Sequence, residues 1–234
     1  MLAYLTTLYL GHWFRSLAQG ALVTVLIGLA GMGLGLCGGA LLGTIKWLRI
    51  PILSMTIEIL TLVLCSIPEI LIIYLLYFGS QPFVDFTAKI MGLQSLGDAI
   101  FPFIVALTAI ATIASAYISE AVRASLNIIP LSHIEAAKAL GLKPWQVFWH
   151  ILRPQIVRLS LPSLNNIWQN VIKDTALLSA IGMGELLRIS TIGANTLGLP
   201  FIFYGVAAIF YLIITFFSQA TFKAIAHMLQ IEAN

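Results

Sequence analysis

Charged side chains are scarce in this chain of 234 residues. Asp, Glu, Lys and Arg make up 9% of it, whereas a soluble domain carries about 25%. Hydrophobic residues make up 60%, and the mean hydropathy is +1.00. These values exclude an ordinary soluble domain, a disordered chain and a water-soluble nucleic-acid binder, because each of these needs many more charges. The sequence therefore predicts an integral membrane protein, in which a net charge of +3 is the basic excess expected of Lys and Arg kept on the cytoplasmic side.

Cysteines and nucleotide-binding motifs are also scarce. The two cysteines, Cys37 and Cys65, lie in apolar stretches, so we interpret them as small buried hydrophobic residues and expect neither a disulfide framework nor a metal site. The sequence contains no G-x-x-x-x-G-K-[ST] loop, and it contains no H-E-x-x-H or G-x-S-x-G motif. ATP must therefore be bound by another chain if it is used, and we do not expect an enzyme.

Long apolar stretches are what the sequence has in place of charges. Five of them approach or exceed the roughly 20 residues that a helix needs to cross a membrane, at about residues 20–45, 59–80, 99–119, 163–184 and 200–222. Pro68 and Glu69 interrupt the second stretch, and Pro200 is placed to open the last helix. Residues 189–199 before it are expected to form an external loop or a re-entrant turn. The sequence thus predicts an all-α membrane protein with five spans.

Glycines are concentrated in the first of these stretches, between residues 28 and 43. Small residues let neighbouring helices approach closely where lipid provides no hydrophobic drive for association. We therefore expect this helix to be packed against other helices, although the same glycines would also be tolerated in contact with lipid.

The distribution of basic residues predicts the orientation of the chain. If the C-terminus is cytoplasmic, eight Lys and Arg residues fall on the inside and three on the outside, which favours an N-out, C-in arrangement. Residues 1–19 are then expected to form a short helix in the outer membrane interface, with an unstructured external tail as the alternative. Residues 223–234 form a cytoplasmic tail, and residues 20–222 form the transmembrane domain.

The longest hydrophilic segment, residues 120–162, carries signals of ordered helices. Ser132 and Glu135 have the spacing of a capping box, and Gly141 lies where a left-handed C-terminal cap is expected. Pro144 is placed to begin a second short helix, which Pro154 is expected to end. Two short helices on the cytoplasmic face indicate a docking surface for another protein, although the loop would also be stable if it folded against its own membrane domain.

The same loop carries a recognisable pattern. Its E-A-A residues, the glycine that follows and the last I-x-x-P element are Glu135, Ala136, Ala137, Gly141, Ile151 and Pro154. This spacing resembles the pattern of the membrane subunits of ABC importers with the type I (MetI-like) fold. That pattern has a leucine before the proline, where this sequence has Arg153. The resemblance implies that the loop is a coupling helix that enters a cleft on a separate ATP-binding cassette subunit. ATP and Mg would then be held by that subunit, and this chain would need no cofactor.

Three further segments narrow the resemblance to permeases for polar amino acids. They are residues 67–71 with 77–79, residues 116–123, and residues 173–177. In the first of them Cys65 stands where the pattern has arginine. The resemblance implies a multi-pass subunit of the bacterial cytoplasmic membrane that imports polar, basic amino acids such as arginine, lysine, ornithine or histidine. It also implies an external substrate-binding protein and a second permease subunit, either another copy or a homologue.

Charged residues within the predicted spans are candidates for the substrate site. Glu69, Lys173 and Asp174 each cost at least about 2.5–3.5 kcal/mol at bilayer depth, so they require a partner, water or a ligand. Lys173 and Asp174 lie on one predicted helix. They form a polar stripe there together with Asn166, Gln169 and Asn170.

In our interpretation the two carboxylates, Glu69 and Asp174, receive the positive groups of a basic amino acid, and Lys173 receives its carboxylate. Tyr117 and Thr175 would form part of the wall. The structural alternative is that Lys173 pairs with Glu69 or Asp174, while the amides join neighbouring helices.

Two other functions would also use intramembrane carboxylates. An ion-coupled secondary transporter is one, but it would not need the two-helix loop. An intramembrane enzyme with an acid pair is the other, but the four histidines lie near span ends or in the loop. Five spans are few for one chain to enclose a path, which again indicates a second membrane subunit.

Overall fold

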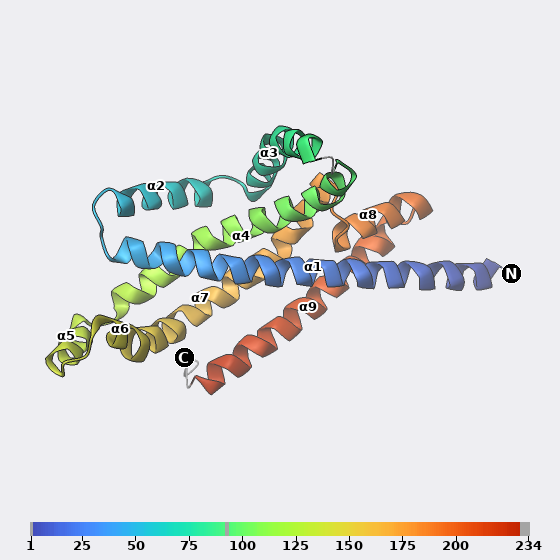
Figure 1. Ribbon diagram of the computed structural model, residues 1–234. Coiled ribbons are helices and arrows are strands. Elements are labelled where there is room, and N and C mark those ends of the chain that lie inside the picture. Colours follow the sequence, from blue (N-terminus) through green and yellow to red (C-terminus); the bar gives the residue numbers. More distant parts are fainter. Residues whose placement is uncertain (1, 92–93, 230–234) are drawn as a thin grey trace.

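The computed structural model describes residues 2–91 and 94–229, and every element in these two ranges is a helix (Figure 1). The prediction of an all-α protein is therefore confirmed for this part of the chain. The elements are α1 (Leu2–Trp47), α2 (Leu53–Ser66), α3 (Glu69–Met91), α4 (Gln94–Ile128), α5 (Leu131–Ala139), α6 (Pro144–Val147), the π-helical turn η1 (Phe148–Leu152), α7 (Arg153–Asp174), the 3-10 helix η2 (Thr175–Ile181), α8 (Leu186–Leu197) and α9 (Pro200–Met228).

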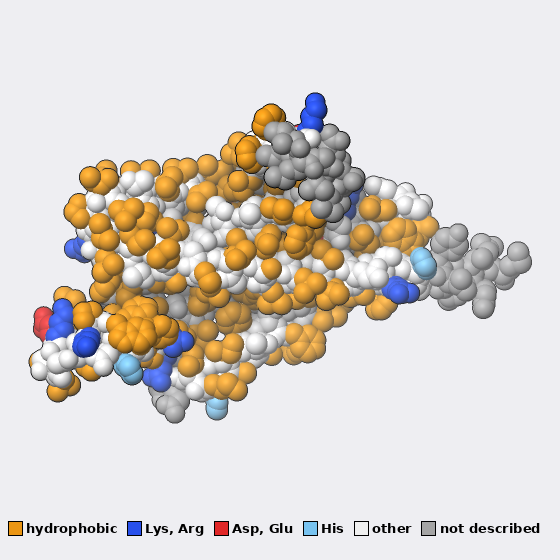
Figure 2. All heavy atoms as spheres, viewed as in Figure 1, with side chains coloured by type: hydrophobic (Ala, Val, Ile, Leu, Met, Phe, Trp, Pro, Cys, Tyr) orange, Lys and Arg blue, Asp and Glu red, His pale blue; other side chains and the backbone are white. Residues whose placement is uncertain are grey.

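Four helices in the described ranges are long and apolar enough to cross a membrane. They comprise residues Gly11–Trp47, Glu69–Phe86, Ile100–Ile128 and Pro200–Met228. A fifth span results if the pair Pro144–Ile181 and Leu186–Leu197, bent by 52°, crosses once. Hydrophobic side chains cover most of the surface along these helices (Figure 2). A soluble protein would bury them, so this surface is typical of one that faces lipid.

The second predicted span, residues 59–80, is two helices in the structure. α2 ends at Ser66, Ile67 is extended with φ −86° and ψ 136°, and α3 begins at Glu69. The proline accounts for this break, because a residue before proline avoids helical backbone angles and Pro68 has no N–H to donate. The single helix long enough to cross in this region begins at Glu69, and the boundaries of this span within the membrane stay a prediction.

The first predicted span belongs to a longer helix. α1 is continuous from Leu2 to Trp47, so residues 2–19 are joined to residues 20–45 without a break (Figure 1). The placement of residues 1–19 in the membrane interface stays a prediction.

Residues 189–199 are mainly helical as well. Only Gly198, at φ +67°, and Leu199 separate α8 from α9, and Pro200 opens α9 as expected. The fully buried carboxylate of Glu185 caps α8, because it accepts hydrogen bonds from the backbone N–H groups of Leu187 (2.7 Å) and Arg188 (2.6 Å). These residues therefore form a short capped helix, and their external or re-entrant position stays a prediction.

Glycines on one face of α1 allow it to pack closely against α4. A Cβ atom on Gly35 would lie 2.6 Å from the Cβ of Ala114, and one on Gly39 would lie 2.6 Å from the Cβ of Ile118. Gly31 and Gly43 are equally close to α4, so the close-packed glycines recur every four residues. Backbone-to-side-chain contact of this kind gives α1 and α4 their shared core, which confirms the predicted packing role.

We expect Gly35→Leu to destabilise the protein by about 1–3 kcal/mol, because the added side chain must displace α4. Gly33→Leu is a matched control, since Gly33 is exposed on the same helix and a Cβ there would meet no atom within 4 Å. The measurement is the thermal stability of the two purified variants in mild detergent. Equal stability of the two variants would contradict this packing role.

Candidate functional site

Two predicted site residues, Glu69 and Tyr117, are in direct contact. The Tyr117 hydroxyl on α4 donates a hydrogen bond to Oε1 of Glu69, at a distance of 3.1 Å. Glu69 lies in the first turn of α3, where the helix dipole favours a negative charge. Asp174 ends α7 directly before η2, which packs against α3, the helix that begins with Glu69. The fold therefore brings α3, α4 and α7 together around two carboxylates.

Lys173 does not neutralise this pair by direct contact. The ion pairs within 4.0 Å that the structure shows in the described ranges join other residues, and the Lys173 side chain is exposed on α7. The alternative in which Lys173 pairs with Glu69 or Asp174 is therefore not the arrangement in this structure. In the part of the chain that the structure describes, no cationic group lies within 4.0 Å of either carboxylate.

The amides of α7 divide between two environments. Asn166 and Asn170 are exposed together with Lys173, so one face of this helix presents polar groups at the surface. Asn165 and Gln169 lie on its edge, and their side chains have buried polar atoms without a hydrogen-bond partner in the structure. Such groups are costly in an apolar medium, which indicates that this part of α7 meets water, substrate or another chain.

Thr175 has a structural environment. Its side chain is fully buried, and its hydroxyl donates to the carbonyl of Ile172 at 2.7 Å. It lies directly after Asp174, at the point where α7 tightens into the 3-10 helix η2. Of the two residues predicted to form the wall of the site, Tyr117 therefore contacts Glu69 of the acidic pair Glu69 and Asp174. Thr175 supports the end of α7.

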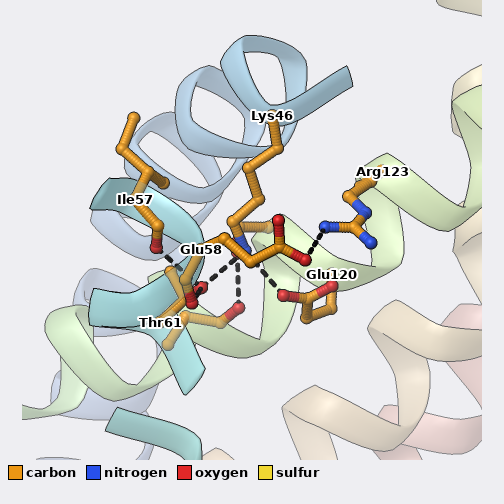
Figure 3. Close-up of polar contacts among 8 residues, drawn as sticks. Lys46, Ile57, Glu58, Thr61, Glu120 and Arg123 are labelled. Atoms are coloured by element: carbon orange, nitrogen blue, oxygen red, sulfur yellow. Dashed lines mark hydrogen bonds and ion pairs between the residues drawn. The ribbon is translucent and has the colours of Figure 1, made fainter. Parts of the chain in front are cut away.

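A second polar cluster joins α1, α2 and α4 (Figure 3). The ammonium group of Lys46 is buried, and it donates hydrogen bonds to Thr61 (2.6 Å), Ser119 (3.1 Å) and the carboxylate of Glu120 (2.6 Å). Charge-assisted bonds are the strong class of hydrogen bond, and here they offset the cost of removing Lys46 from water. The cluster holds the middle of α2, at Thr61, against the other two helices.

Arg123 and Glu58 form a further link between α4 and α2. The Arg123 guanidinium donates to Oε1 of Glu58 at 2.7 Å, and this hydrogen bond lowers the pKa of the Glu58 carboxyl. Sequence reasoning recognised Glu120 and Arg123 only as part of a pattern, and it counted Lys46 as a solvent-facing basic residue. Lys46 and Arg123 each contact residues that are distant in sequence. The one signal in the sequence for this polar cluster was the grouping of Ser119, Glu120 and Arg123.

We expect Lys46→Met to weaken the attachment of α2 by about 1.5–3 kcal/mol, the value typical of hydrogen bonds to a charged group. Arg49→Met is the control, because Arg49 is exposed and lies only three residues away. Limited proteolysis of residues 48–66 in the purified protein measures the attachment. If both variants are cleaved at the wild-type rate, the cluster does not hold α2.

The loop 120–162 forms the two short helices that the sequence predicts, but its capping box is absent. α5 begins at Leu131 after Pro130, with no side-chain cap, and the carbonyl of Pro130 accepts from the N–H of His133. Because the helix begins two residues earlier than expected, with Pro130 as its N-cap, Ser132 lies inside its first turn and Glu135 has no capping role. Pro144 begins α6, as predicted.

Gly141 adopts the predicted left-handed cap, with φ +79°. Its N–H bonds the carbonyl of Lys138 (2.9 Å), and the N–H of Leu142 bonds that of Ala137 (3.1 Å). These two bonds make up a Schellman motif. Ala137 is buried in a small apolar cluster of the loop, whereas Glu135 and Ala136 are exposed on α5.

Pro154 does not end the second helix. The chain passes from α6 through the π turn η1 into α7, and the N–H of Arg153 bonds the carbonyl of Phe148 five residues earlier. The wider turn gives the proline ring room that a regular helix would deny it. The second short helix is therefore continuous with α7, contrary to the prediction.

Comparison with known proteins identifies the family. Residues 31–226 match the family model described as "Binding-protein-dependent transport system inner membrane component". The nopaline transport system permease protein of Agrobacterium fabrum is 35% identical over 212 residues, which cover 90% of this chain and 89% of that protein. The histidine/lysine/arginine/ornithine transport system permease protein of Escherichia coli is 28% identical over 84% of this chain and 86% of its own length.

Two solved structures share the fold. A crystal structure of an amino acid ABC transporter with histidines has a TM-score of 0.78 at 22% identity, covering 94% of this chain and 97% of its own. An inward-facing methionine ABC transporter has a TM-score of 0.72 at 19% identity, and the match covers 92% of this chain and 97% of that chain. These two structures confirm the type I fold. The family match and the permease relatives decide against the ion-coupled transporter and the acid-pair enzyme. The chain belongs to the family of inner membrane permease subunits of binding-protein-dependent ABC transporters.

Proposed function

We propose that this permease subunit carries amino acids with a cationic side chain, such as arginine, lysine, ornithine or histidine. The observation that supports this most directly is the pair of carboxylates, Glu69 and Asp174, which contact no cation among the described residues. A basic amino acid brings two positive groups and so complements two negative ones. The relative from Escherichia coli, named for histidine, lysine, arginine and ornithine, is consistent with this substrate class.

The residues around the pair have separate proposed roles. Glu69 and Asp174 receive the α-amino group and the cationic side chain, while Lys173 attracts the substrate carboxylate. The Tyr117 hydroxyl holds the Glu69 carboxylate in place through its hydrogen bond. Thr175 contributes by supporting the end of α7, which carries Asp174.

We further propose that the loop 120–162 couples transport to ATP hydrolysis on a separate ATP-binding cassette subunit. Glu135 and Ala136 are exposed on α5 and are available for that contact, whereas Ala137 and Gly141 shape the helix from within the loop. ATP and Mg would be bound entirely by the partner, since this chain has no phosphate-binding loop.

A second permease subunit is part of the same proposal. The exposed face of α7 carries Asn166, Asn170 and Lys173, and polar side chains of this kind are costly in contact with lipid. Another copy of this chain, or a homologue, would cover this face and complete the path. An external binding protein would deliver the substrate to the N-out side of the membrane.

The experiment is ATP-driven uptake by the complete complex, purified with its attached chains and reconstituted in vesicles. Labelled arginine is the substrate, and unlabelled lysine, ornithine, histidine or leucine compete in the presence of the binding protein. We expect the basic amino acids to compete and leucine to have no effect. Competition by leucine as strong as that by lysine would overturn the proposed specificity. The chains that co-purify identify the second permease subunit.

A further inference from the structure

Three aromatic side chains and an arginine form an exposed surface where α6 leads into α7. This basic aromatic surface consists of Trp145, Phe148, Trp149 and Arg153. The rings of Trp145 and Trp149 are 5.2 Å apart, and the Arg153 guanidinium lies 4.7 Å from the centre of the Trp149 ring. Trp145 is 62% exposed and Trp149 is 40% exposed. Side chains of this size are rarely left in water without a binding partner.

The loop does not need these aromatic rings for its own core. Val147 and Leu152, on the opposite side of the same segment, are buried with Ala137 and Ile129 in the apolar cluster of the loop. The basic aromatic surface therefore faces away from the interior of the loop. Figure 2 shows hydrophobic side chains gathered over α6, with Lys and Arg side chains around them.

The charged side chains of α6, η1 and the first two turns of α7 are all basic. Lys143 begins the segment and Arg158 follows it on α7, while residues 136–173 contain no Asp or Glu. The surface is thus complementary to an acidic partner. Arg153, which replaces the leucine of the related pattern, supplies the cation above the Trp149 ring.

The position of the surface favours lipid over protein as that partner. α6 and η1 continue without a break into α7, which belongs to the candidate span Pro144–Ile181. The aromatic rings therefore lie at the beginning of a membrane-crossing helix. Trp is enriched at the level of the lipid headgroups, and Arg extends its charge toward phosphate there.

We propose that the basic aromatic surface binds the headgroups of acidic phospholipids at the membrane interface. Trp145 and Trp149 insert at headgroup depth, and Arg153 and Lys143 contact the phosphate. This contact fixes the level at which α6 leaves the membrane and so positions α5 below it. This lipid contact is separate from the proposed transport of amino acids. It applies whichever side of the membrane the loop faces.

The test uses the complete complex in vesicles of phosphatidylcholine with a fraction of phosphatidylglycerol, where one of the two lipids is brominated close to the headgroup. Brominated phosphatidylglycerol is expected to quench tryptophan emission more than brominated phosphatidylcholine does. The excess should disappear in Trp145→Phe/Trp149→Phe and remain in Trp168→Phe, since Trp168 is buried. Lys143→Gln and Arg153→Gln should each lower the preference for phosphatidylglycerol about fivefold, as expected for one basic residue at an acidic surface.

Two results would overturn the proposal. One is equal quenching by the two brominated lipids in the wild-type complex. The other is quenching that appears only after the ATPase subunit has been stripped from the vesicles, because the surface would then be a protein contact. Neither result would affect the proposed amino-acid specificity, which is measured by competition for uptake.

Discussion

Gly141→Leu is expected to uncouple ATP hydrolysis from transport and to reduce uptake to the background level. The glycine adopts φ +79° in the cap that ends α5, and a bulky residue there costs about 1–2 kcal/mol. The side chain itself would meet open space, so the expected effect comes from the backbone alone. A changed cap redirects the exposed face of α5, which carries Glu135, away from its proposed contact.

The measurement compares uptake with ATP hydrolysis stimulated by the binding protein, in vesicles that contain equal amounts of assembled complex. Gly141→Asn is the matched control, because asparagine tolerates the left-handed conformation and should retain most of the activity. Normal coupling in a well-assembled Gly141→Leu complex would show that this cap has no part in the contact with the ATPase.

Neutralising the acidic pair is expected to have the next largest effect. Glu69→Gln and Asp174→Asn should each lower the apparent affinity for basic amino acids about tenfold to a hundredfold, since a hydrogen bond between charged groups contributes about 1.5–3 kcal/mol. Both changes preserve the shape of the side chain. Because no cation contacts either carboxylate, the yield of the complex should stay near that of the wild type.

The control for these variants is Asp85→Asn. Asp85 is an exposed carboxylate on α3, the helix that also begins with Glu69, so the change removes the same charge at a distance from the pair. Uptake of labelled arginine at a series of concentrations gives the apparent affinity. Unchanged uptake in both Glu69→Gln and Asp174→Asn would exclude the two carboxylates as substrate ligands. A loss of yield without a loss of affinity would assign them to folding.

Backbone signals in the sequence were the most reliable guides to this fold. Gly141, Pro144 and Pro200 take the predicted positions because a positive φ or a missing N–H is a property of the residue itself. The capping box of Ser132 failed for a different reason. It depends on the exact first residue of α5, which begins two positions earlier than the box requires.

The acidic pair was predicted in part and the Lys46 cluster was not. Glu69 and Asp174 were identified because charge is costly within an apolar stretch. Lys46 lies at the end of such a stretch, where a basic residue is expected in water, and its partner Glu120 is 74 residues away. No local pattern encodes a contact of that separation, which depends on how α1, α2 and α4 pack.

The continuity of α4 has a mechanical consequence. This one helix carries Tyr117 beside Glu69 and ends at Ile128, only three residues before α5 begins. Tyr117 and Ile128 are eleven positions apart, or about 17 Å along the axis at 1.5 Å per residue. A helix of this length is stiff, and close packing on the glycines of α1 limits its bending. If an ATPase subunit moves α5, we therefore expect α4 to tilt as one body and to change the contact between the Tyr117 hydroxyl and the Glu69 carboxylate.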